Sequence, residues 1–321
     1  MTAYFWILYP MLFILGFVLL IGGGNLLVNG AVALAKRLNL SPLLIGLTVV
    51  GFGTSVPELI ASLFALNQSV PDLAVGNVIG SNIANILLVL GVAACIRTIK
   101  ISKLSLRRDG KFLLLATFVL FCAVFLGQIN FLLGLIMCLC LCYYVYYAYQ
   151  TDKRHSLLVQ KLEEPTHPKR RERKKMIWVD FANVALGIGL TCFGARILVD
   201  NAVLLAKHLG ISTEIIGLTL IAVGTSLPEL ATSVIASIKK QSDVAFGNIV
   251  GSNIYNALFI LGFLALFQPI HIPTTLQPDV LWMTGATLLL LLFAYTQHKI
   301  SKGMGILFLV IYTAYIYYIG V

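Results

Sequence analysis

The sequence predicts an all-α integral membrane protein in which ten transmembrane helices form two inverted-topology repeats of five helices each. Three observations support this prediction: an apolar composition, a series of helix-length uncharged segments, and an internal duplication. Hydrophobic residues make up 59% of the 321-residue chain and charged residues only 11%, whereas about a quarter of the residues of a soluble domain are charged. The composition therefore places the chain in a membrane.

The ten helices follow from the length of the apolar segments, since a helix needs about 20 apolar residues to cross the hydrocarbon core. One uncharged stretch, 112–151, is too long for a single helix and has Gly127, Gln128 and Asn130 near its centre, so we expect two helices there. Three segments with only isolated charges add one helix each: 42–67, 178–206 and 213–238. The other uncharged stretches are 2–35, 73–96, 244–277, 280–297 and 303–321.

Positive charge is unevenly distributed over the predicted loops. If the N-terminus lies outside, 21 of the 23 Lys and Arg residues fall in cytoplasmic loops, while Lys207 lies in an outside loop and Arg196 within a span. Because cytoplasmic loops are enriched in Lys and Arg, we predict that both termini face outside and that residues 151–175 form a cytoplasmic linker. We place the protein in a bacterial or archaeal inner membrane. Its basic run at 169–175 is then explained by a cytoplasmic location, and we expect no nucleic-acid partner.

One unit of the chain occurs twice. Residues 41–91 align without a gap to residues 212–262 at a constant offset of 171, with 25 of 51 positions identical. The duplication divides the chain into a first half at 1–150 and a second half at 176–321. Because each half contains an odd number of predicted helices, the second half enters the membrane from the opposite side. Inverted repeats of this kind build many secondary transporters.

Two glutamates lie at matching positions within the duplicated spans. Glu58 lies about two thirds of the way along its span, and Glu229 has the same depth in a span of opposite direction. A charge near the bilayer centre costs at least a few kcal/mol, so an ionisable group there indicates a functional site. The alternative is a protonated glutamate that only hydrogen-bonds between helices. We favour a pair of carboxylates that binds a cation.

Groups that supply oxygen atoms accompany both glutamates. Pro57 lacks an N–H, so the carbonyl of Gly53 loses its helical donor, and Pro228 has the same effect on Gly224. Carbonyls freed beside a carboxylate suit hard cations such as Ca²⁺. Hydroxyl and amide side chains recur at helical spacing, as Thr54, Ser55, Ser81 and Asn85 in the first copy and as Thr225, Ser226, Ser252 and Asn256 in the second.

Other residues of these segments have predicted packing roles. Asn82 and Asn253 fall on a different helix face from the amides above, and we expect them to hydrogen-bond across to a neighbouring helix. Gly22, Gly23 and Gly24 in the first helix are typical of a surface on which two helices pack closely or slide.

The motifs G-T-S-x-P-E and G-S-N-I-x-N, each present in both halves, resemble the paired repeats of the calcium/cation antiporter superfamily, the sodium/calcium exchangers, and in particular its prokaryotic ten-helix members. The resemblance implies exchange of Ca²⁺ for Na⁺ at a central site, with helices 1 and 6 as a sliding pair that alternates access. It also implies the ligands: the carboxylates of Glu58 and Glu229, the eight hydroxyl and amide side chains named above, and the carbonyls of Gly51 and Ala222.

The chain departs from the family pattern at Asn256, where well-studied exchangers often carry an aspartate. The site then holds two acidic groups, which neutralise one divalent ion. Coupling of Ca²⁺ transport to H⁺ or K⁺ therefore stays open, and a cation channel is a less favoured alternative. The sequence has no G-x-S-x-G or H-E-x-x-H motif, so we expect neither enzymatic activity nor a cofactor.

Overall fold

The computed structural model describes residues 2–68, 70–162, 173–208 and 222–320. Within these residues, nine helical segments are long and apolar enough to cross a membrane, and α12 is a shorter apolar helix. The predicted span at 213–238 begins outside the described residues, which resume at Ala222. The multi-pass membrane architecture is thus confirmed for the part of the chain that the structure describes.

Six of these spans are single helices. The predicted division of residues 112–151 is confirmed, because Gly127 adopts a left-handed conformation (φ 75°) and ends one helix there. The six helices are α1 (Thr2–Leu38), α7 (Lys103–Leu126), α8 (Phe131–Leu162), α9 (Arg173–His208), α15 (Gln277–Gln297) and α16 (Lys302–Gly320).

The duplicated segments form broken helices instead. In the first copy these are α2 (Pro42–Ile45), η1 (Gly46–Val50), α3 (Gly51–Thr54) and α4 (Val56–Asn67), followed by α5 (Pro71–Ala84), η2 (Asn85–Val89) and α6 (Leu90–Ile96). In the second copy they are α11 (Ala222–Thr225) and α12 (Leu227–Ile238), followed by α13 (Ser242–Tyr255), η4 (Asn256–Ile260) and α14 (Leu261–Ala265). The only other helix among the described residues is the short η5 (Thr274–Leu276).

Two helices start or end differently from the uncharged stretches. The helix α7 begins at Lys103 rather than near residue 112, because the Ser102 hydroxyl accepts a hydrogen bond from the Ser105 N–H and caps it. Its first turns therefore include basic residues that we assigned to a loop. Helices α8 and α9 also extend into the predicted linker at 151–175, since α8 continues to Leu162 and α9 begins at Arg173.

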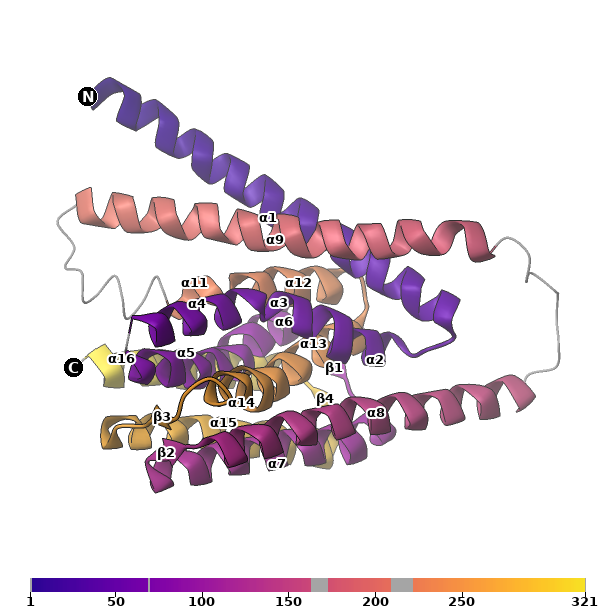
Figure 1. Cartoon of the computed structure of the whole chain (residues 1–321). Coiled ribbons are helices and arrows are strands. Elements are labelled where there is room, and N and C mark those ends of the chain that lie inside the picture. The colour runs from indigo at the N-terminus through magenta and orange to yellow at the C-terminus, as the bar shows by residue number, and fades with distance from the viewer. Residues whose placement is uncertain (1, 69, 163–172, 209–221, 321) are drawn as a thin grey trace.

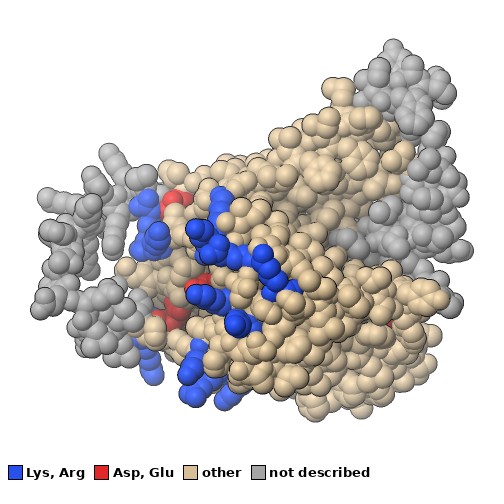
Figure 2. Space-filling model, turned by 180° about the vertical axis from the view of Figure 1, so that it is seen from behind, with Lys and Arg blue, Asp and Glu red and all other residues tan. Residues whose placement is uncertain are grey.

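The two ends of the molecule differ in charge. The N-terminal end of α1 and the C-terminal end of α16 lie at one end, and α8 finishes and α9 starts at the opposite end (Figure 1). On the face shown in Figure 2, the Lys and Arg side chains gather toward this second end. The arrangement agrees with an even number of membrane crossings.

Helices α1 and α9 lie side by side along one side of the molecule (Figure 1) and contact each other through glycines. A side-chain carbon at Gly16 would lie 3.2 Å from the Gly194 carbonyl, and one at Gly23 would lie 2.9 Å from the Gly187 carbonyl. At the offset of 171, Gly16 corresponds to Gly187 and Gly23 to Gly194. The two contacts are therefore copies of each other.

Two short antiparallel ladders repeat this relation. Strand β1 (Ile99–Lys100) pairs with β4 (Lys299–Ile300), and β2 (Gln128–Ile129) pairs with β3 (Ile270–His271). Ile99 lies opposite Ile300, and Ile270 lies opposite Ile129. Since Ile270 and Ile300 are the positions that follow Ile99 and Ile129 by 171 residues, each ladder is the copy of the other.

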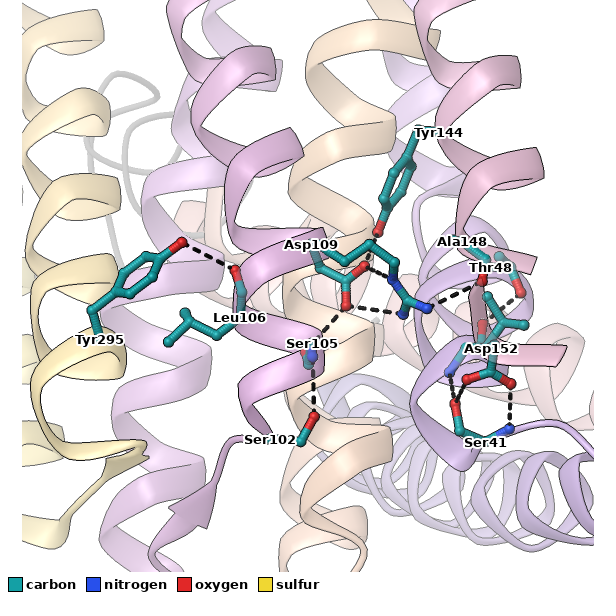
Figure 3. A network of polar contacts seen from close by, with 12 residues as sticks. Ser41, Thr48, Ser102, Ser105, Leu106, Asp109, Tyr144, Ala148, Asp152 and Tyr295 are labelled. Atoms are coloured by element: carbon teal, nitrogen blue, oxygen red, sulfur yellow. Dashed lines mark hydrogen bonds and ion pairs between the residues drawn. The ribbon is translucent and has the colours of Figure 1, made fainter. Parts of the chain in front are cut away.

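A buried polar network ties α7 and α8 to the start of α2 (Figure 3). Arg108 donates to the Asp109 carboxylate at 2.6 Å and to the Ala148 carbonyl at 3.1 Å, and both charged side chains are buried. The buried carboxylate of Asp152 in α8 accepts hydrogen bonds from the backbone N–H of Ser41 at 2.7 Å and from its hydroxyl at 2.5 Å. The network therefore anchors the first broken span at its N-terminal end.

Candidate ion-binding site

The site is built around two helix breaks that proline produces. Ser55 (φ −82°, ψ 3°) separates α3 from α4, and Ser226 (φ −87°, ψ 6°) separates α11 from α12. Proline follows two residues after each serine, where its missing N–H costs nothing because the first turn of a helix has no partner for it. Glu58 and Glu229 consequently lie in the first turns of α4 and α12. The partial positive charge of a helix N-terminus favours a carboxylate there.

The carboxylates of the two glutamates are both buried. Glu58 and Glu229 are both 0% exposed and lie close enough for two negative charges on them to repel each other. All four of their carboxylate oxygens have no hydrogen-bond partner among the described residues. The alternative of a glutamate that merely hydrogen-bonds between helices therefore finds no support in the described contacts.

Further buried oxygens have no partner either. Buried polar atoms in native proteins nearly always have a hydrogen-bond partner, and each exception calls for an explanation. Here the exceptions are concentrated in the duplicated segments. Within the described residues they include the hydroxyls of Ser55, Ser81 and Ser226, the side-chain carbonyl of Asn85, and the whole side-chain amide of Asn256.

The two copies meet at Gly51. Its carbonyl accepts hydrogen bonds from the hydroxyls of Ser252 at 3.2 Å and Thr54 at 3.4 Å, and these two hydroxyls lie 3.4 Å apart. The Glu229 carboxylate lies near Thr54, Ser55 and Ser252 but has no hydrogen-bond partner among the described residues. Oxygen atoms from both copies therefore lie close together near the Glu229 carboxylate.

The expectation for Gly53 needs correction. Its carbonyl lacks a helical donor as predicted, but it accepts a weak hydrogen bond from the thiol of Cys192 in α9 at 3.9 Å. The carbonyl that joins the hydroxyl cluster is that of Gly51, two residues earlier. In the second copy, Ala222 begins α11 and Thr225 ends it.

Asparagines hold the two copies together, as expected. The Asn82 side chain donates to the backbone carbonyl of Asn253 at 3.2 Å, its own counterpart at the offset of 171. The Asn85 side chain donates to the side-chain oxygen of Asn253 at 3.2 Å. Since Asn85 uses its amide nitrogen in this contact, its side-chain oxygen remains available for a ligand.

Two further asparagines were missed at the sequence level. The side chain of Asn248 donates to the Glu229 backbone carbonyl at 3.3 Å and to the Ser233 hydroxyl at 3.0 Å. Asn77 repeats both contacts, with the Glu58 carbonyl at 3.3 Å and the Ser62 hydroxyl at 3.1 Å. The available signal was a pattern present in both copies, G-N-x-x-G at residues 76–80 and 247–251. Both side chains therefore contact the backbone of a glutamate rather than its carboxylate.

The chemistry of this donor set favours hard cations. Carboxylate, hydroxyl, amide and carbonyl oxygens bind Ca²⁺ and other hard ions, while transition metals prefer histidine and cysteine. In the part of the chain that the structure describes, no group of three or more His, Cys, Asp or Glu residues could hold a metal ion. The fold and the site thus define a multi-pass membrane protein with two buried carboxylates among buried oxygen donors of the kind that hard cations prefer.

Comparison with known proteins identifies the family. The family model for the sodium/calcium exchanger protein matches residues 8–150 and 180–321. The chain is 37% identical to the putative antiporter CaxA of Alkalimonas amylolytica (95% of this chain, 96% of the relative) and 32% identical to the sodium/calcium exchanger MaX1 of Methanosarcina acetivorans (95% and 97%). The chain belongs to the sodium/calcium exchanger family.

Solved structures agree with this membership. The sodium–calcium exchanger NCX_Mj, soaked with 2.5 mM Na⁺ and 1 mM Sr²⁺, matches the fold with a TM-score of 0.83 at 30% identity over 98% of both chains. The chain also shares 37% identity with the inner membrane protein YrbG of Escherichia coli, covering 92% of each. The resemblance to prokaryotic exchangers is therefore confirmed.

Proposed function

We propose that this protein is a secondary active antiporter that exchanges Ca²⁺ for Na⁺ by alternating access. The observation that carries the proposal is the pair of buried carboxylates, Glu58 and Glu229, whose four oxygens have no hydrogen-bond partner among the described residues. Two like charges in a buried site repel each other, and a divalent cation between them cancels both. The exchange activity in the names of the relative MaX1 and of the structural neighbour NCX_Mj supports the choice of ions.

The proposed ligands are the ones that the resemblance implies. They comprise the two carboxylates and, around them, the carbonyls of Gly51 and Ala222 and the side chains of Thr54, Ser55, Ser81, Asn85, Thr225, Ser226, Ser252 and Asn256. The unpartnered oxygens of Ser55, Ser81, Asn85, Ser226 and Asn256 support this assignment. Na⁺ and Ca²⁺ are substrates in this proposal, and the site holds no resident cofactor.

We propose ten transmembrane helices in two inverted repeats, 1–150 and 176–321, joined by the linker at 151–175. The glycine contacts and strand ladders that recur at an offset of 171 support the duplication. An inner-membrane location is supported by the relative YrbG, whose name places it there. The basic end of the molecule (Figure 2) faces the cytoplasm in this proposal, and both termini face outside.

Flux measurements in proteoliposomes test the exchange. We expect Ca²⁺ uptake only when an opposing Na⁺ gradient is present. If an H⁺ or K⁺ gradient drives the uptake instead, that ion and not Na⁺ is exchanged for Ca²⁺. Uptake without any counter-ion would indicate a channel. Glu58→Gln and Glu229→Gln should each reduce Ca²⁺ uptake to background, because each removes half of the negative charge of the site.

The matched control is Asp72→Asn, which neutralises an exposed acidic residue of the same duplicated unit. It should transport Ca²⁺ like the parent protein. Near-normal uptake by Glu58→Gln would refute the central role of the glutamate pair.

A further inference from the structure

The two sides of the site differ in packing. A cavity of about 530 Å³ lies between α4 and α9, beside Pro57, Thr225 and Pro228. Ile60 and Phe64 of α4 line one wall, and Cys192, Ala195 and Asp200 of α9 line the other. Since Pro57 and Pro228 directly precede the two glutamates in sequence, this cavity reaches the edge of the ion-binding site.

On the other side of the site, α1 and α12 are in contact, and a smaller pocket of about 280 Å³ lies beside Asn29 and Lys239. A side-chain carbon at Gly24 in α1 would lie 2.5 Å from the terminal carbon of Ile235 in α12, so the two helices touch there. One turn further along, the Lys239 ammonium group donates to the side-chain oxygen of Asn29 at 2.7 Å. This bond joins the C-terminal end of α12 to α1.

The duplication shows that these two regions are equivalent in sequence although they differ in packing. At the offset of 171, Gly24 corresponds to Ala195, Asn29 to Asp200 and Ile235 to Phe64. Ala195 and Phe64 therefore line the cavity in one copy, whereas their counterparts Gly24 and Ile235 are in contact in the other. The polar pair differs as well, because Asp200 forms an ion pair with Arg196 of its own helix at 3.6 Å.

We propose that Lys239 and Asn29 form a gate that closes the cytoplasmic route to the ion site, and that the cavity between α4 and α9 is the open extracellular route. The inference rests on the proposed function and orientation. It assigns the described conformation to the outward-facing state and makes the Lys239–Asn29 bond a contact of that state alone. A bond made in one of two states biases their populations by its own free energy.

The physical argument for Lys239 is its charge. A hydrogen bond from an ammonium group is stronger than one between neutral groups, and its loss shifts a two-state equilibrium about tenfold. The equivalent position in the first copy is Gln68, which carries no charge. The Lys239–Asn29 contact therefore stabilises the closed cytoplasmic side more than Gln68 and Asp200 would stabilise a closed extracellular side.

The rate at which Cys192 is labelled measures how accessible the cavity between α4 and α9 is, since this side chain is partly accessible and lines the cavity. The other five cysteines are replaced by serine, and a charged, membrane-impermeant methanethiosulfonate is added to intact cells that express the full chain. We expect Lys239→Gln and Asn29→Ala to slow Cys192 labelling, by at most about tenfold, because the labelling rate follows the fraction of the outward-facing state. Gln68→Lys, which places an ammonium group at the position equivalent to Lys239, should slow it as well.

The matched control is Asn25→Ala, because the Asn25 side chain donates only to the Ile21 carbonyl of its own helix at 3.0 Å among the described contacts. This variant and Lys239→Arg should label at the parent rate. Unchanged labelling in both Lys239→Gln and Asn29→Ala would overturn the gate. A variant that misfolds would lose Ca²⁺ exchange and label Cys192 faster rather than slower, which also counts against the proposal.

Ca²⁺ flux in the same cells separates this inference from the proposed function. If the parent protein shows no Na⁺-dependent Ca²⁺ flux while the gate variants still slow labelling, the proposed exchange is wrong and the gate stands. If the flux is present and the labelling rates do not change, the gate is wrong and the exchange stands.

Discussion

Glu58 and Glu229 depend on neighbouring residues to hold their positions, and the two copies differ in how many contacts they supply. Asn248 is fully buried and contacts the Glu229 carbonyl, the Ser233 hydroxyl and the Thr54 hydroxyl, the last at 3.1 Å. Asn77 is partly exposed and repeats the first two of these contacts. Asn248 therefore links the second glutamate to a proposed ligand of the first copy.

Asn248→Ala should weaken Ca²⁺ binding about 10- to 100-fold, the usual effect of losing a group that orients a metal ligand. The expected signature is a rise in the Ca²⁺ concentration that gives half-maximal exchange, measured in proteoliposomes. Asn77→Ala is the comparison and should have the smaller effect, since it lacks the contact across the two copies. An unchanged Ca²⁺ dependence in Asn248→Ala would show that this asparagine does not position Glu229.

At the scale of helices, the ion pair between Arg108 and Asp109 shows why α7 begins earlier than the apolar pattern indicates. Asp109 accepts hydrogen bonds from Arg108, from the Ser105 hydroxyl at 3.1 Å and from the Tyr144 hydroxyl at 3.2 Å. Tyr144 belongs to α8, so the pair also fixes the packing of these two helices (Figure 3). A charged residue can enter a span when its charge is paired and its hydrogen bonds are made.

Asp109→Asn should destabilise the protein by about 3–5 kcal/mol, because it leaves the Arg108 charge buried without a partner. The measurement is the Tm of the detergent-solubilised protein. Replacing both residues, as Arg108→Met with Asp109→Leu, should recover much of the loss. Arg196→Met is the control: it breaks an ion pair whose side chains are 76% and 64% exposed, and its Tm should change little. Equal Tm values for Asp109→Asn and the parent would contradict this account.

At the scale of the whole molecule, charge distribution predicts how the protein sits in the bilayer. On the face shown in Figure 2, Lys and Arg gather toward the end of the molecule at which α8 finishes and α9 starts, and the two chain termini lie at the other end (Figure 1). Retention of basic loops in the cytoplasm orients membrane proteins during insertion. The basic end is thus expected inside the cell.

A reporter enzyme that is active only in the cytoplasm should be silent when it is fused after Val321 and active when it is inserted between residues 163 and 172. The reason is the bias of 21 basic residues in the predicted cytoplasmic loops against one in the outside loops. A reporter that is active only outside provides the reciprocal control. Cytoplasmic activity of the fusion after Val321 would mean that the predicted even number of helices is wrong.

The sequence by itself determined the membrane class, the split at Gly127, the duplication and the paired glutamates beside proline. These features follow from local chemistry: apolar length fixes a span, proline removes a backbone donor, and a buried carboxylate is too costly to occur without a role. The constant offset of 171 then related the two halves without any knowledge of their packing.

Only the tertiary structure decided which groups meet. The contact of Ser252 with Gly51, the bond of Asn82 to its own counterpart Asn253, and the approach of Cys192 to Gly53 join residues far apart in the chain. The sequence also treats the two copies as equal, whereas the structure separates them into a cavity on one side and the Lys239–Asn29 contact on the other. Such differences arise because two similar segments pack against different neighbours, and periodicity along one chain carries no information about that packing.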